Sequence, residues 1–141
     1  MADDVEVRYL YPPNHEGGAN PVPVRKVIVV MAGLSDGTGE TDVVKIRLTD
    51  LMRHGGETPT RTSIERIQGN VHGMTVLLEW DRAANAEIAL LGPGVYDQDY
   101  RTGGGRVDYG EEGDRTGDIM LTSIYADSGD SYDLTLTVRL K

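Results

Sequence analysis

Carboxylates of the kind that bind hard cations cluster in two loops: Asp36, Glu40 and Asp42 in the first, Asp127, Asp130 and Asp133 in the second. Calcium favours such clusters together with loop carbonyls. Neither loop has the D-x-[DN]-x-[DN]-G order of a calcium-binding loop. Asp is also an ordinary turn residue, because its side chain can bond to its own backbone. We therefore interpret both loops as solvated turns and expect no metal site.

Other residues with reactive side chains lack the spacing or the sequence context that catalysis or cofactor binding requires. The chain has no cysteine, and His15, His54 and His72 are too far apart to suggest a zinc site. The glycine-rich stretches 33–39 and 103–105 do not continue into the Gly-Lys-Ser/Thr of a phosphate-binding loop. Ser35 matches the G-x-S-x-G pattern at residues 33–37, but further turn residues follow it in place of the helix that a nucleophile elbow requires. We expect a non-enzymatic protein with no catalytic residue and no cofactor.

Aromatic residues leave one binding function open. Trp80 ends an alternating apolar stretch, and Tyr96, Tyr100 and Tyr109 follow it in a glycine-rich region. Rings with polar groups suit contact surfaces, so a carbohydrate-binding β-sandwich, with or without calcium, is an alternative. A core position is the simpler interpretation of Trp80. Paired carboxylates for glycoside hydrolysis cannot be selected from the sequence, because their separation in space decides their role.

The elements that would position these residues are strands. Turn residues separate eight β-patterned stretches, which are residues 5–11, 24–30, 43–48, 62–68, 74–80, 87–91, 118–125 and 131–140. About eight short strands predict an all-β fold, an antiparallel β-sandwich of the jelly-roll or Greek-key type. We expect the last two stretches to form a hairpin. Residues 95–118 read as a long loop, and residues 49–54 as one helical turn.

The N-terminal residues differ in composition from the rest. Residues 5–11 alternate, and four prolines between positions 12 and 23 then predict an extended connector. We predict a Pro/Gly-rich arm over 1–23 and a β-sandwich domain over 24–141. The arm could add a strand to a neighbouring sheet, or the same segment could pair within its own sandwich. The candidate partner-binding residues are Val5, Val7, Tyr9, Leu10 and Tyr11.

Charge excludes several classes of partner. The chain has 141 residues, with 14 Lys+Arg against 23 Asp+Glu, giving a net charge of −9. This charge disfavours nucleic acid phosphates and anionic membrane surfaces. The longest nearly apolar stretch, 27–34, is far shorter than the roughly 20 residues that cross a bilayer. The acidic N-terminus is unlike a secretory signal, so we expect synthesis and retention in the cytoplasm.

Four stretches carry a resemblance: GLSDGTGETDVVK at 33–45, VLLEWD at 76–81, TGDIMLT at 116–122 and GDSYDLTL at 129–136. Together they resemble small structural proteins of tailed bacteriophages, of the kind that decorate or cement the head. The similarity covers most of residues 28–141 and leaves the arm outside it. It implies a virion component with a jelly-roll-like core, no enzymatic activity and a viral protein as partner.

The resemblance and the charge together predict a place in the particle. A protein of charge −9 would be repelled by packaged DNA, so we expect it on the outer surface of the head, bound to the major capsid protein after synthesis in the host cytoplasm. Homo-oligomers are expected on general grounds, and a trimer would suit a threefold lattice position. The alternatives are a tail or head-to-tail joining component and a carbohydrate-binding module.

Overall fold

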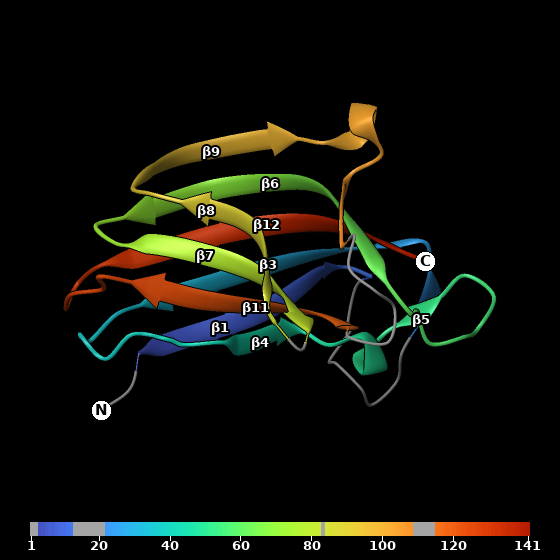
Figure 1. Cartoon of the computed structure of the whole chain (residues 1–141), viewed down its shortest axis with the longest axis horizontal. Helices are drawn as coiled ribbons and strands as arrows, with labels where there is room; N and C mark the ends of the chain where they lie inside the picture. Colours follow the sequence, from blue (N-terminus) through green and yellow to red (C-terminus); the bar gives the residue numbers. More distant parts are fainter. Residues whose placement is uncertain (1–2, 13–21, 83, 109–114) are drawn as a thin grey trace.

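The computed structural model describes residues 3–12, 22–82, 84–108 and 115–141, and in it two antiparallel sheets pack against each other as an all-β sandwich (Figure 1). The larger sheet has six strands in the order β1-β3-β12-β6-β10, and β9 also pairs with β6. Their bounds are β1 Asp4–Tyr11, β3 Lys26–Leu34, β6 Thr62–His72, β9 Gly94–Asp99, β10 Arg106–Val107 and β12 Ser131–Leu140.

The smaller sheet has four strands in the order β4-β11-β7-β8. They are β4 Val43–Ile46, β7 Thr75–Arg82, β8 Ala86–Leu91 and β11 Arg115–Ile124. The short strands β2 (Pro23–Val24) and β5 (Met52–Arg53) pair in parallel, and Leu48–Asp50 (η1) and Arg101–Gly103 (η2) are short 3-10 turns. Among the described residues, no helix has the length and apolar composition needed to cross a bilayer.

Alternation along the strands builds the core between the sheets. Every second residue of β3 from Val27 to Gly33 is buried, and so is every second residue of β12 from Tyr132 to Leu140. From the smaller sheet, β7 contributes Val76, Leu78 and Trp80. Because side chains alternate between the faces of a strand, this period-2 pattern directs one apolar face of each sheet inward. All eight predicted strands are present, and the predicted all-β sandwich is confirmed; the jelly-roll or Greek-key topology stays a prediction.

Three local predictions need correction. Residues 95–118 are not one long loop, because residues 94–99 form β9, which pairs with β6 from Arg66 to Val71. The last two strands do not form a hairpin: β11 pairs with β7 and β4, whereas β12 pairs with β3 and β6. The connection between them therefore crosses from one sheet to the other. The helical turn expected at 49–54 is shorter and earlier, at Leu48–Asp50.

The glycine triplet at 103–105 has a structural role. The Gly105 N–H donates to the Tyr100 carbonyl at 2.8 Å, and the Ser63 hydroxyl donates to the Gly104 carbonyl at 3.0 Å. A Cβ on Gly105 would lie 2.0 Å from the Ser63 Oγ, and the φ angle of Gly105 is +88°. Only glycine fits this position without strain, because it tolerates positive φ and the close approach of β6.

Candidate functional site

The predicted partner-binding residues form β1, an outer strand of the larger sheet. β1 pairs antiparallel with β3, from Asp4 opposite Leu34 to Tyr11 opposite Ile28. Of the two arrangements left open by the sequence, the structure contains pairing within the same chain. The division between 23 and 24 stays a prediction, and the connector at 13–21 lies outside the described residues.

Four of the five predicted residues are exposed despite being apolar or aromatic. The exposed fractions are 44% for Val5, 38% for Val7, 50% for Leu10 and 44% for Tyr11. Tyr9 instead packs against the core. Its burial, and secondarily the charge of Asp50, raise the pKa of Tyr9 to about 12. Tyr9 therefore anchors β1 to the core, while the other four side chains are open to a partner.

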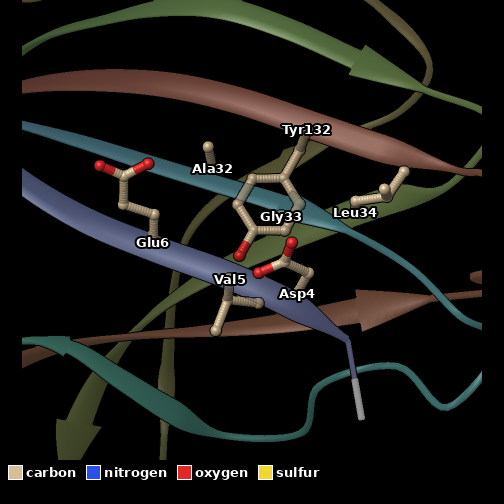
Figure 2. A pocket seen from close by; sticks show the side chains of 7 residues that line it. All are labelled: Asp4, Val5, Glu6, Ala32, Gly33, Leu34 and Tyr132. Atoms are coloured by element: carbon tan, nitrogen blue, oxygen red, sulfur yellow. The ribbon is translucent and has the colours of Figure 1, made fainter. Parts of the chain in front are cut away.

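A pocket of about 250 Å³ lies at the N-terminal end of β1. Figure 2 shows the Tyr132 ring lying across Gly33. A Cβ on Gly33 would come within 2.5 Å of Tyr132 Cε1, so glycine makes room for this ring. The lining residues are Asp4, Val5, Glu6, Ala32, Gly33, Leu34 and Tyr132.

A buried polar cluster lies behind the pocket. The Tyr132 hydroxyl donates to Glu40 Oε1 at 2.6 Å, and Lys45 Nζ donates to Glu40 Oε2 at 2.5 Å. All three residues are buried. Burial, followed by the hydrogen bond to Glu40 and the charge of that carboxylate, raises the pKa of Tyr132 well above its ordinary value. The hydroxyl stays protonated at neutral pH. Its hydrogen bond to Glu40 joins β12 to the loop that follows β3.

The first described residue, Asp3, ties β1 to that same loop. Its Oδ1 accepts hydrogen bonds from the Ser35 hydroxyl at 3.4 Å and from the Asp36 and Gly39 backbone N–H groups at 3.2 Å each. Asp36, one of the carboxylates considered for calcium, accepts a hydrogen bond from the Thr38 N–H. A hydrogen bond from the Thr38 side chain, followed by this backbone bond, lowers the pKa of Asp36. The loop carboxylates are thus used in local backbone and side-chain contacts.

The second acidic loop is also a turn. Asp130 Oδ2 accepts a hydrogen bond from the Asp127 N–H at 2.9 Å, and the Asp130 N–H donates to the Asp127 carbonyl at 3.0 Å. Within the part of the chain that the structure describes, no group of three His, Cys, Asp or Glu side chains could hold a metal ion. His15 lies outside that part.

Two carboxyl groups do come together on the smaller sheet. Partial burial and a hydrogen bond with Asp42 raise the pKa of Glu79. Asp42 also accepts a hydrogen bond from the Thr122 hydroxyl at 3.2 Å. The sequence could not select this pair, because Asp42 and Glu79 are brought together by the sheet. Neither residue lines the pocket at β1, and we assign the pair no reaction.

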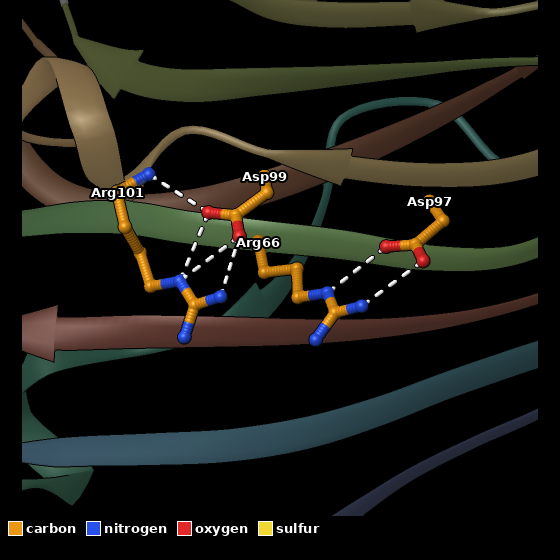
Figure 3. Close-up of polar contacts among 4 residues, drawn as sticks. All are labelled: Arg66, Asp97, Asp99 and Arg101. Carbon is orange, nitrogen blue, oxygen red and sulfur yellow. Dashed lines mark hydrogen bonds and ion pairs between the residues drawn. The ribbon is translucent and has the colours of Figure 1, made fainter.

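One exposed ion pair joins β9 to β6, and a second joins the end of β9 to the η2 turn (Figure 3). Arg66 donates from Nε and an Nη to the two carboxylate oxygens of Asp97, at 2.9 and 3.0 Å. The Arg101 Nε donates to Asp99 at 2.9 Å. These hydrogen bonds lower the pKa of Asp97 and the pKa of Asp99. Such pairs on a surface set geometry more than stability.

The aromatic residues considered for sugar binding are differently placed. Trp80 is 2% exposed and belongs to the core, which confirms the simpler interpretation. Tyr96 and Tyr100 are partly buried against the core, and the Tyr96 hydroxyl donates to the Gly92 carbonyl at 2.6 Å. Tyr109 lies outside the described residues. Trp80 therefore cannot present its ring to a sugar.

No family model matches the chain, and comparisons with the curated proteins and with the solved structures find no match either.

Proposed function

We propose that the chain is a non-enzymatic structural protein of a tailed-phage particle, a decoration or cement protein that binds the major capsid protein on the outer face of the head. The observation that carries the proposal is the exposed strand β1, where Val5, Val7 and Leu10 are open to solvent at the edge of a sheet. An edge strand offers backbone groups for strand addition, and its alternating side chains define a register. In this proposal β1 is the strand through which copies of the protein associate on the head, and other surfaces of the sandwich contact the capsid protein.

Two sequence features support this role. The four stretches between 33 and 136 resemble phage head-decoration proteins. The net charge of −9 disfavours the inner face of a shell filled with DNA and suits the outer face. Many copies on a lattice gain from multivalency, so each contact can be small.

The test is co-sedimentation of the purified protein with heads that lack it, prepared from the virus that encodes it. Saturable binding at lattice positions, located by image reconstruction, is the expected result. Rings of the protein that bind tails or the head-to-tail junction, with no binding to intact heads, would contradict the decoration role and favour a joining component. Binding in a glycan screen without binding to heads or tails would favour the carbohydrate-binding alternative.

A further inference from the structure

Strand β1 has one paired and one outward edge. Its pairing with β3 is continuous from Asp4 to Tyr9. Within the described residues, no strand pairs with its other edge, because β1 ends the strand order of the larger sheet. Unpaired backbone groups along an eight-residue strand are a template for another strand.

The two faces of β1 differ in chemistry. Val5, Val7 and Tyr9 lie opposite Gly33, Met31 and Val29 of β3, whose positions face the core. Val5 and Val7 nevertheless stay exposed, so the smaller sheet leaves part of this face uncovered. Asp4, Glu6 and Arg8 occupy the opposite face and are exposed. Neither Glu6 nor Arg8 forms an ion pair with another described residue.

These side chains are complementary to a second copy of themselves. If two β1 strands pair antiparallel about Val7, Glu6 of each copy lies opposite Arg8 of the other. Val7 then faces Val7 of the second copy. Opposite charges and apolar side chains placed directly across an antiparallel pair both stabilise it. The two Glu6–Arg8 contacts and the central valine pair form an arrangement with twofold symmetry.

Other registers are worse. A shift of two positions in one direction places Glu6 opposite Glu6 of the second copy, which offsets the two Asp4–Arg8 contacts that this register forms. A shift in the other direction places Arg8 opposite Arg8. A shift of one position joins the core side of one copy to the solvent side of the other. The sequence of β1 therefore favours one register.

From this complementarity we infer that β1 pairs with β1 of a second copy, antiparallel and centred on Val7, so that two larger sheets continue into each other across a twofold axis. The inference rests on the assembly role proposed for β1 and names its partner at that strand. The pairing of the two β1 strands covers Val5 and Val7 and leaves the rest of each sandwich free to contact the capsid shell. It also replaces the trimer expected from general lattice considerations with a dimer.

Charge reversal tests the register. Light scattering and sedimentation equilibrium of the wild-type protein should give a dimer. Glu6→Arg or Arg8→Glu places like charges opposite each other twice and should raise the dissociation constant about tenfold or more. The double variant Glu6→Arg/Arg8→Glu restores opposite charges and should return the constant to within about threefold of the wild type. Circular dichroism confirms that each variant is folded.

Cysteine cross-linking tests the centre of symmetry, and the chain has no native cysteine to interfere. Opposed residues of an antiparallel pair have Cα atoms about 4.5–5.5 Å apart, within the range of a disulfide. Val7→Cys should therefore cross-link under mild oxidation. Val5→Cys is the matched control on the same face, because the inferred register places the two introduced thiols four residues apart along the strand, about 13 Å.

A monomeric or trimeric wild-type protein would overturn the inference, as would single charge reversals with unchanged affinity or equal cross-linking of the two cysteine variants. Head co-sedimentation separates this from the proposed function. A cross-linked Val7→Cys dimer that fails to bind heads contradicts the decoration role while the dimer stands. A wild-type monomer that binds heads saturably contradicts the dimer alone.

Discussion

Glu40 forms hydrogen bonds with residues from three parts of the chain. Its carboxylate accepts hydrogen bonds from Lys45 on β4 and Tyr132 on β12, and its backbone N–H donates to the Ser123 hydroxyl at 2.8 Å. A buried carboxylate paired with a buried ammonium is costly to break, because the remaining charge has no partner. Glu40 therefore contributes to stability by neutralising the buried charge of Lys45.

We expect Glu40→Gln to lower the free energy of unfolding by about 3–5 kcal/mol, because it leaves the buried Lys45 ammonium without its counter-charge. Urea denaturation measures the change. Asp97→Asn is the matched control, since it breaks an exposed ion pair with Arg66 and should leave stability almost unchanged. Equal effects of the two variants would contradict the structural role of Glu40.

Trp80 is a second test of the core. Trp80→Ala should lower the free energy of unfolding by ~3–5 kcal/mol, through lost apolar burial and the cavity that is left. Val95 is 82% exposed, and Val95→Thr keeps the β-branched shape, so it should change stability by less than about 0.5 kcal/mol. A cost below about 1 kcal/mol for Trp80→Ala would place the ring at the surface.

The titration of Tyr9 predicts a loss of stability at alkaline pH. The pKa of Tyr9 is about 12 in the folded protein, above the ordinary value of 10.0. Its contribution is fully present below pH 10 and is lost as the pH rises from 10 to about 12, because the unfolded chain releases the phenolic proton first. Tyr9→Phe should make the fall in unfolding free energy over this range less steep.

At the scale of elements, β1 is attached to the sandwich by few of its own side chains. Tyr9 packs against the core and Asp3 bonds to the loop after β3. The buried hydrophobic cluster itself runs from Val24 to Leu140. The core strands thus form a unit to which β1 adds an edge.

Deleting residues 1–23 should leave a domain that unfolds cooperatively, because the buried cluster is retained. We expect a lower melting temperature, since Tyr9 and the Asp3 contacts are lost, and a loss of self-association. Thermal unfolding followed by circular dichroism and light scattering of the truncated protein measure both. An unfolded truncated protein would contradict the division of the chain at residue 24.

At the scale of the whole molecule, β1 and β4 lie along one side of the sandwich and β9 along the other (Figure 1). This arrangement leaves the edge of the larger sheet at β1 accessible while β4 ends the smaller sheet nearby. Val43 of β4 is also exposed. Exposed valines of β1 and β4 therefore occur on the side proposed for assembly, whereas the exposed Val95 belongs to β9 on the other side.

The net charge of −9 also makes a prediction for the whole molecule. Binding to duplex DNA at physiological salt should be weaker than the ~100 μM limit typical of non-specific binding, because the protein cannot replace the counterions of the phosphates. A gel-shift titration with a basic DNA-binding protein as positive control measures this. Retarded DNA at low micromolar protein would contradict the outer-face placement.

The fold class could be predicted from the sequence, because β-branched or alternating stretches between turns, such as 24–30 and 131–140, are a local property of the chain. The sequence also predicted β1 as a strand and Trp80 as a core residue. Which strands pair depends on contacts between parts of the chain that are distant in the sequence. β11 and β12 are neighbours in the chain but belong to different sheets, and β9 became a strand because β6 was beside it. Tyr132 likewise reaches Glu40 only because β12 packs near a loop that is distant in the sequence, and no local pattern encodes that contact.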